Sequence, residues 1–250
     1  MKTGNVRQFL NSIEVVNTGL TKMRLGNRND GGYVVFVEGC KACDSLYSFG
    51  VGDDVGFEID FIQRFDNAKA VMLYDPTIDE LPDYHEKFLF FKEDVRQSIR
   101  LACLHNAPML KIDVEHCEWK ALNILSDEDF EKIPQIVAEF HLLHVEPPQG
   151  LSPYFHRVYK GVSDSVNAAM FDFYWDVLLK LKKHFYIGHL HPNNSLPLVN
   201  IEGNMVPPLL ELTFINKSLV HSVEPITNIK PIFGLDFPNK TDRPDVEFLV

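Results

Sequence analysis

Residues 46–61, LYSFGVGDDVGFEIDF, combine a short apolar run, a glycine-rich turn and a segment with helical spacing. The run from Leu46 to Phe49 has the character of a buried strand, and apolar residues recur from Phe57 onward on one helix face. Gly50 and Gly52 let the backbone approach a ligand, because no Cβ intervenes. The helix start adds unpaired N–H groups. The stretch predicts the strand–turn–helix unit of a nucleotide-binding α/β fold.

The charge of the turn narrows the choice of ligand. Asp53 and Asp54 lie in the turn, and Glu58 follows one helical turn later. These acids repel a pyrophosphate at short range but favour a ligand with an ammonium and a sulfonium group, which is S-adenosylmethionine (SAM). Gly56 also comes one position late for the strict dinucleotide fingerprint. The alternative is an ordinary connection whose acids cap the helix.

Composition excludes several classes of protein. The chain has 250 residues, of which 45% are hydrophobic and 24% charged, as in one soluble globular domain. Its net charge of -11 disfavours a nucleic-acid partner. No apolar run reaches the length of a membrane span, and the N-terminal segment MKTGNVRQFL has no signal-peptide core. We expect a cytoplasmic protein without a nucleic-acid or membrane partner; the sequence gives no oligomeric state.

Four cysteines are present, at positions 40, 43, 103 and 117. The spacing of Cys40 and Cys43 fits half of a zinc site or a redox pair, but no second pair follows. We expect these cysteines to lie in a polar loop before the first core strand, as reduced thiols without a function.

The N-terminal region predicts a helix and a hairpin. Apolar residues from Val6 to Val16 recur at helical spacing. The Asp30-Gly31-Gly32 turn lies between two apolar runs, residues 23–25 and 33–37, which favours a hairpin. The alternative is a loop that closes over a ligand with Arg24 and Asp30, which we assign to substrate binding.

The rest of the chain predicts alternating strands and helices. A helix is expected directly after residue 116 and another over residues 163–184. We expect one domain, with a cap and hairpin over residues 1–43, a SAM-binding core over 44–216 and a surface tail over 217–250. The further strands are expected at residues 70–74, 88–91, 107–114, 134–143, 185–190 and 209–215.

Acidic residues follow the predicted parallel strands. Asp75 ends the second strand, about one βαβ step after Gly50, where an acid accepts hydrogen bonds from ribose hydroxyls. Glu93 and Asp94 follow the third strand, near the expected adenine position, although a helix N-cap explains them equally well. Asp113 ends the fourth strand beside the glycine turn, where ligands bind in such sheets.

The predicted fifth strand carries Glu139 and His141 inside an apolar run. Parallel strands are usually apolar throughout, so two polar residues there are unusual. Because they are two positions apart, their side chains point to the same face of the sheet. A second polar group, His189-Leu-His191-Pro-Asn193-Asn194, follows the sixth strand.

Three fragments together resemble the SAM-dependent methyltransferases, and most closely the FkbM-like group. They are GNRNDGGYVV (26–35), YSFGVGDDVGFEIDF (47–61) and KIDVEHCEWKAL (111–122). The resemblance implies a Rossmann-like fold with a seven-stranded, mostly parallel sheet and helices on both faces. It also implies O-methyl transfer to a sugar or a similar hydroxylated small molecule or glycan. This chain departs from the group at His116, where the group usually has glycine.

The resemblance also implies roles for individual residues. Asp113 would lie at the active centre, and Glu115 would serve in positioning or in holding the helix start. We assign Asp113, Glu115 and His141 together to catalysis. The substrate side would include His116, His189, His191 and Asn193. The cofactor would be held by Gly50, Gly52, Asp53, Glu58, Asp75, Glu93 and Asp94.

An alcohol is a poor nucleophile at neutral pH, so a base or a metal ion must help to remove its proton. By likeness to catechol-type methyltransferases, Asp113 and Glu139 would bind Mg²⁺ or Mn²⁺, with His141 as ligand or base. A metal-free site is an equal alternative. A zinc site on His141, His189 and His191 is less favoured.

Two other functions stay open. One is a non-catalytic module that binds SAM or a partner protein. The other is methylation of a protein. Base methylation is disfavoured, because residues 112–115 lack the Asn/Asp-Pro-Pro-aromatic element typical of it.

Overall fold

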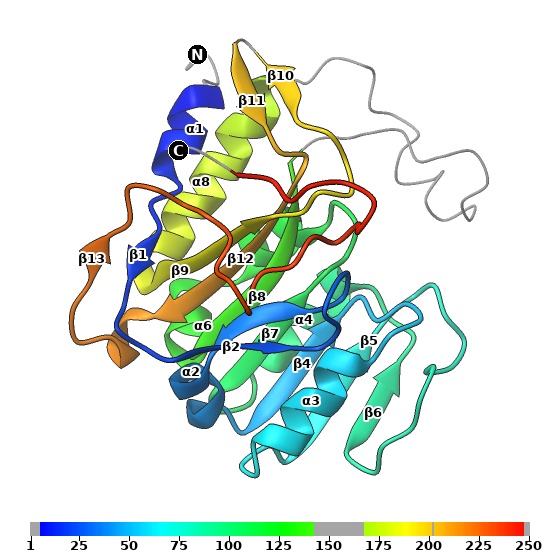
Figure 1. Cartoon of the computed structure of the whole chain (residues 1–250). Coiled ribbons are helices and arrows are strands. Elements are labelled where there is room, and N and C mark those ends of the chain that lie inside the picture. Colours follow the sequence, from blue (N-terminus) through cyan, green and yellow to red (C-terminus); the bar gives the residue numbers. More distant parts are fainter. Residues whose placement is uncertain (1–5, 143–167, 202, 248–250) are drawn as a thin grey trace.

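A computed structural model describes residues 6–142, 168–201 and 203–247. Its centre is a seven-stranded sheet in the order β6-β5-β4-β7-β8-β12-β9 (Figure 1). Neighbouring strands from β6 to β8 are parallel, and β12 is antiparallel to both β8 and β9. This is the Rossmann-like methyltransferase fold that the sequence predicts. The strands are β4 (Ser45–Phe49), β5 (Ala70–Tyr74), β6 (Phe88–Phe91), β7 (Pro108–Ile112), β8 (Gln135–His141), β9 (Phe185–Pro192) and β12 (Leu209–Asn216).

Helices cover both faces of the sheet, and each face has its own apolar core (Figure 1). Alternate side chains of β4 serve the two cores, since Leu46 belongs to one and Tyr47 to the other. The first face carries α2 (Val37–Ala42), α3 (Gly56–Arg64) and the hairpin of β2 (Lys22–Leu25) and β3 (Tyr33–Phe36). The second carries α1 (Val6–Ser12), α4 (Val95–Ala102), α5 (Glu118–Ile124), α6 (Asp127–Lys132) and α8 (Ala168–His184). No described helix is long and apolar enough to cross a membrane.

Short elements complete the described chain. They are β1 (Val16–Asn17) paired with β13 (Glu224–Pro225), β10 (Val199–Ile201) paired with β11 (Asn204–Val206), and the 3₁₀ helix η1 (Lys217–Leu219).

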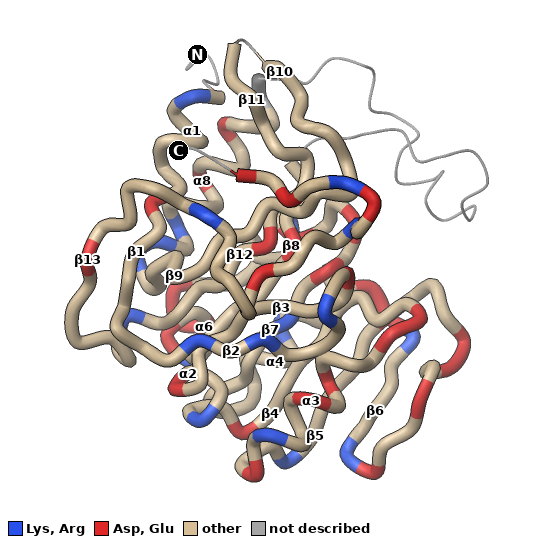
Figure 2. The backbone as a smooth tube through the Cα atoms, viewed as in Figure 1, with Lys and Arg blue, Asp and Glu red and all other residues tan. Residues whose placement is uncertain are grey.

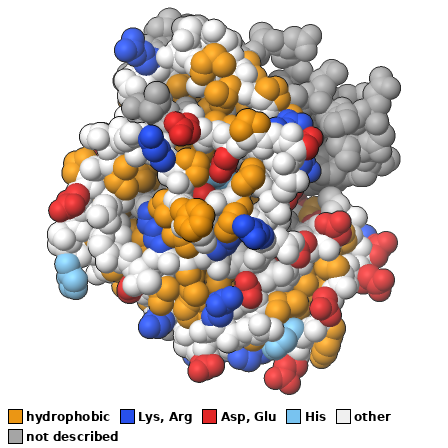
Figure 3. Space-filling model, viewed as in Figure 1, with side chains coloured by type: hydrophobic (Ala, Val, Ile, Leu, Met, Phe, Trp, Pro, Cys, Tyr) orange, Lys and Arg blue, Asp and Glu red, His pale blue; other side chains and the backbone are white. Residues whose placement is uncertain are grey.

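The C-terminal segment, residues 232–245, returns to the hairpin of β2 and β3, where it contacts residues 24–30 (Figure 1). Arg24 Nη1 donates to the carbonyl of Leu235 at 3.2 Å, and Asn29 Nδ2 donates to the carbonyl of Pro238 at 2.7 Å. The Arg28 guanidinium lies 4.5 Å from the centre of the Phe237 ring. Figure 3 views this face, where hydrophobic side chains gather between Lys and Arg side chains. The segment therefore fixes a loop more than 200 residues earlier in the chain.

Two local expectations were wrong. The helix expected over residues 6–16 ends at Ser12, because the chain then turns to place β1 beside β13. The polar loop expected around the cysteine pair is the helix α2, in which Cys40 is buried, with Cys43 buried at its end. Burial raises the pKa of Cys40 to about 12, and all four cysteines are free thiols. Of the helix expected over 163–184, the first five residues lie outside the described part.

Gly50 and Gly52 provide a matched test of the turn. Gly50 has φ +82°, and a Cβ there would lie 1.6 Å from the carbonyl oxygen of Asp113. Gly52 has φ +60°, and its Cβ would meet nothing within 4 Å. We expect Gly52→Ala to lower the free energy of unfolding by about 1–2 kcal/mol, the cost of a left-handed residue. Gly50→Ala adds a backbone clash and should cost more than about 3 kcal/mol. Chemical unfolding followed by circular dichroism measures both; equal losses would contradict this close approach.

Candidate functional site

A cavity of about 420 Å³ lies at the carboxyl ends of β4, β5 and β7. The glycine turn after β4 forms one wall, and the starts of α4 and the loop after β7 form others. The hairpin loop adds Asn27, Asp30 and Gly31. The cavity thus lies where the sheet order reverses, which is the usual ligand position in this kind of fold. Of the predicted site residues, those that line it are Asp30, Gly50, Gly52, Asp53, Asp75, Asp94, Asp113 and Glu115.

Asp75 fixes the glycine turn. Its Oδ2 accepts hydrogen bonds from the backbone N–H groups of Val51 and Gly52, each at 2.9 Å. Its Oδ1 accepts from the backbone and the hydroxyl of Thr77, at 2.7 and 2.6 Å. Burial raises the pKa of Asp75, but these hydrogen bonds outweigh burial and lower it overall. All four favourable acceptor directions of the carboxylate are used. A ribose hydroxyl would therefore share an oxygen with the turn.

Lys111 and Glu58 form a buried pair behind the turn. Lys111 Nζ lies 3.3 Å from Glu58 Oε1 and donates to the carbonyl of Gly50 at 3.1 Å. Glu58 also accepts from the Ser48 hydroxyl at 2.5 Å and is fully buried. Glu58 was predicted to bind the cofactor, but it does not line the cavity. It pairs instead with Lys111, which does line the cavity. The sequence signal for Lys111 is a charged residue inside the otherwise apolar run of β7, two residues before Asp113.

The lining of the cavity is strongly acidic. Acidic residues recur along the loops at this edge of the sheet (Figure 2). Among the described residues, one basic side chain lines the cavity, Lys111, and its charge is balanced by Glu58. The cavity therefore favours a cationic ligand and repels a pyrophosphate. The acidic lining residues are Asp30, Asp53, Asp54, Asp75, Asp94, Asp113 and Glu115.

Of the two acids predicted near adenine, one lines the cavity. Asp94 is the N-cap of α4, and its Oδ1 accepts a hydrogen bond from the backbone of Arg96 at 2.8 Å. Glu93 is exposed and accepts from the Ser98 hydroxyl at 2.6 Å. The position of Asp94 is thus compatible both with a helix N-cap and with a place near adenine. Glu93 does not line the cavity.

Asp113 is a partly buried carboxylate that lines the cavity. Burial raises its pKa to about 6, and Lys111 and His141 oppose that rise. The hydroxyl of Tyr33 donates to Asp113 Oδ2 at 2.7 Å. A carboxylate with a raised pKa in a cavity is a candidate general base. Tyr33 was not predicted, because nothing in its hairpin sequence indicates which strand end it will reach.

Glu115 and His141 meet at the loop after β7. His141 Nε2 lies 3.1 Å from Glu115 Oε2, and His141 Nδ1 lies 2.8 Å from Glu118 Oε1. Burial lowers the pKa of His141, but the adjacent carboxylates outweigh burial and raise it well above its usual value. His116, beside them, has φ +70°. A left-handed backbone favours glycine, so a residue with a Cβ is strained at this position.

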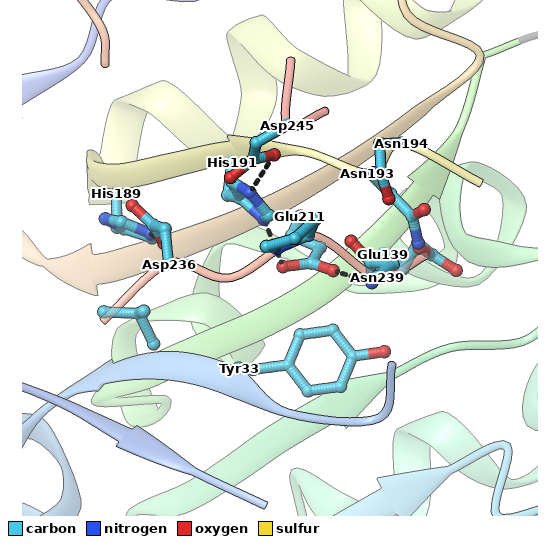
Figure 4. A network of polar contacts seen from close by, with 12 residues as sticks. Tyr33, Glu139, His189, His191, Asn193, Asn194, Glu211, Asp236, Asn239 and Asp245 are labelled. Carbon is cyan, nitrogen blue, oxygen red and sulfur yellow. Dashed lines mark hydrogen bonds and ion pairs between the residues drawn. The ribbon is translucent and has the colours of Figure 1, made fainter. Parts of the chain in front are cut away.

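The other predicted substrate residues belong to a buried network across β8, β12 and β9 (Figure 4). Glu211 of β12 lies in register between Glu139 of β8 and His191 of β9. Asn193 Nδ2 donates to Glu139 at 2.5 Å, and His191 Nδ1 lies 3.0 Å from Glu211. Burial raises the pKa of Glu139 well above its usual value, and Asp113 adds to the rise.

The C-terminal segment completes this network. His189 Nε2 lies 2.8 Å from Asp236, and His191 Nε2 lies 3.0 Å from Asp245. Asn239 donates to Glu211 at 2.7 Å. The histidines predicted for a substrate rim thus have protein partners and are buried. Arg24, also assigned to the substrate, donates instead to the backbone of Asn27, Asn29 and Leu235.

The described residues do not support the expected metal site. Tyr33 contacts Asp113, Asn193 contacts Glu139, and two glutamates occupy the ring nitrogens of His141. Among the described residues, no group of three or more His, Cys, Asp or Glu side chains is arranged to hold a metal ion. The same holds for the zinc alternative.

The chain was compared with protein-family models, curated proteins and solved structures. No family model matches the sequence, and no curated protein matches it. Solved structures with a similar arrangement include the fibrillarin pre-rRNA processing protein of Methanococcus jannaschii, with 11% identity over 71% of this chain and 68% of that chain, at a TM-score of 0.41. A candidate caffeoyl-CoA O-methyltransferase from Staphylococcus aureus has 11% identity over 69% and 76%, at a TM-score of 0.40. A candidate methyltransferase from Streptococcus mutans, in complex with SAH, has 11% identity over 71% and 92%, at a TM-score of 0.32. Similarities this low assign no activity to this chain.

The buried network predicts a pH dependence of stability. Burial lowers the pKa of His191, but its hydrogen bonds to Asp245 and Glu211 outweigh burial and raise it to about 10. A raised pKa stabilises the fold fully below the unfolded value of about 6.5 and progressively less up to the folded value. We expect the stability difference between wild type and His191→Gln to shrink from pH 6.5 to pH 10. Unfolding at each pH measures it, with the exposed His221→Gln as control. A difference that stays constant would contradict the charged pair.

Proposed function

We propose that this protein is a SAM-dependent methyltransferase that methylates a hydroxyl group of a small molecule or glycan. The observation that carries the proposal is the acidic cavity beside a glycine turn in which Gly50 leaves no space for a Cβ. A sulfonium and an ammonium group fit such a lining, whereas the phosphates of a dinucleotide do not. The likeness of three sequence fragments to the FkbM-like group supports the same function.

The residues of the site have separable tasks in this proposal. The backbone around Gly50 and Gly52 and the carboxylate of Asp53 would hold the methionyl end of SAM, and Asp75 would keep the turn in place. SAM, when bound, supplies the electrophilic methyl group. Asp113 would accept the proton of the acceptor hydroxyl, and Tyr33 would hold that carboxylate by its hydrogen bond. Alignment of the reactants can contribute about 7–11 kcal/mol to lowering the barrier.

The acidic lining of the cavity also indicates which kind of molecule would accept the methyl group. Carboxylates accept hydrogen bonds, so a molecule that presents several hydroxyl groups is matched to them. We therefore propose a sugar or a similar polyhydroxylated molecule. Proton transfer to Asp113 needs no metal ion, and the described residues gather no metal site. Three alternatives are a metal-assisted transfer, a module that binds SAM without catalysis, and a protein as the methyl acceptor. Measuring SAM binding and methyl transfer separates them.

Binding and transfer can be measured in sequence. We expect calorimetry to show binding of SAM and of S-adenosylhomocysteine, and no binding of NADH. The protein is then incubated with methyl-labelled SAM and a panel of monosaccharides, oligosaccharides and peptides, with and without EDTA or Mg²⁺. Label on a sugar in EDTA supports the proposal, and label that requires Mg²⁺ supports metal assistance. NADH binding without SAM binding would contradict the cofactor assignment, and SAM binding without transfer to any acceptor favours the binding module.

Asp113 predicts the pH dependence of that transfer. A general base acts when it is deprotonated, so turnover should rise as pH increases through about 6. Asp113→Asn should reduce turnover about 10²–10⁴-fold, with the SAM dissociation constant changed less than about threefold. The exposed Asp83→Asn is the matched control. If turnover is unchanged in Asp113→Asn, Asp113 is not the general base.

A further inference from the structure

The loop after β7 contains two adjacent residues in a left-handed backbone conformation. Glu115 has φ +49° and His116 has φ +70°. One other non-glycine residue in the described part, Ala107, has a positive φ. Residues with a Cβ adopt this conformation at a cost in free energy, and such strain persists only where surrounding contacts hold it. The loop therefore depends on contacts from its neighbours.

One buried carboxylate contacts both this loop and the neighbouring strand β8. Glu118 Oε1 accepts a hydrogen bond from the backbone N–H of His116 at 3.1 Å and lies 2.8 Å from His141 Nδ1. The Glu118 side chain is fully buried, and its Oε2 has no hydrogen-bond partner among the described residues. Glu118 does not line the cavity. Its carboxylate is thus committed to holding neighbouring groups.

His141 connects Glu118 to Glu115, a residue that lines the cavity. Its Nε2 lies 3.1 Å from Oε2 of Glu115, which lines the cavity and is about half exposed. Trp119 Nε1 donates to the carbonyl of His141 at 3.3 Å, which fixes its backbone as well. The charged groups that face this imidazole are Glu118, Glu115, Glu139 and Asp113, with the His116 ring 4.6 Å away between ring centres. Glu118 and Glu115 are the two that bond to it directly.

We propose that Glu118 is a positioning residue which, through His141 and the backbone of His116, holds the strained loop so that the carboxylate of Glu115 faces the cavity. The proposal rests on the proposed function in one respect: the ligand that Glu115 would contact is the one bound in the cavity. A simpler role for Glu118 would be to stabilise α5, because it lies in the first turn of that helix. That role requires neither the imidazole contact nor any effect on Glu115.

Three variants of the full chain separate these roles. Glu118→Gln keeps an oxygen that can accept from His116 and His141, whereas Glu118→Ala removes it. Asp236→Asn changes a buried carboxylate of the same kind, paired with His189 outside the cavity, and is the matched control. The readouts are the exchange rate of the His116 amide, the ¹⁵N signals of the His141 ring and the ¹³C carboxyl signal of Glu115. None of them requires SAM or an acceptor, so they remain interpretable if the proposed function fails.

We expect Glu118→Ala to speed exchange of the His116 amide at least tenfold and to shift the His141 and Glu115 signals. Glu118→Gln should restore the His116 exchange rate to within threefold of wild type. Asp236→Asn should leave all three readouts unchanged. If Glu118→Ala does not fold, Glu118→Gln still tests the proposal, since loss of the charge should shift the His141 and Glu115 signals. A Glu115 signal that stays at its wild-type position in every folded Glu118 variant would overturn it.

Discussion

The contact between the glycine turn and the end of β7 is the constraint on which the site depends. The backbone at Gly50 comes so near to the carbonyl of Asp113 that no side chain fits between them. This brings the turn after β4 directly beside the end of β7, where Asp113 lies. The cofactor wall and the candidate base are therefore placed by one backbone approach. Lys111 reinforces it by donating to the carbonyl of Gly50 from the neighbouring strand.

Placing many carboxylates in and around the cavity is unfavourable in free energy, and local hydrogen bonds and ion pairs offset that cost. Buried carboxylates are unfavourable unless they are hydrogen-bonded or paired. Asp75 receives backbone N–H groups, Glu58 has Lys111, and Glu211 has His191 and Asn239. Asp113 and Glu139 are less fully compensated, and their pKa values rise accordingly. Of these two carboxylates, Asp113 lines the cavity, where a raised pKa is suited to proton transfer.

Much of the fold follows from local sequence. The apolar runs predicted each strand of the central sheet, because buried strands are short and bounded by turns. The glycine turn and the acids after the strands predicted the position of the cavity, because strand ends of a parallel sheet share one edge. What local sequence does not give is contact between distant segments. Tyr33 and Asp236 reach their partners through the hairpin and the C-terminal segment, whose paths leave no local periodicity. His189 and His191 were therefore assigned to a substrate rather than to Asp236 and Asp245.

The distance in sequence between the hairpin loop and the C-terminal segment bears on how the protein folds. Arg24, Asn29 and Asp30 also make contacts with Leu235, Pro238 and Asn239, across more than 200 positions. Contacts of such high sequence separation form late and slowly, because the entropy of closing a long loop must be overcome first. During synthesis the central sheet can form while one wall of the cavity is still unsupported. We therefore expect the part of the cavity wall that the hairpin contributes to become fixed only after residues 235–239 have docked on it.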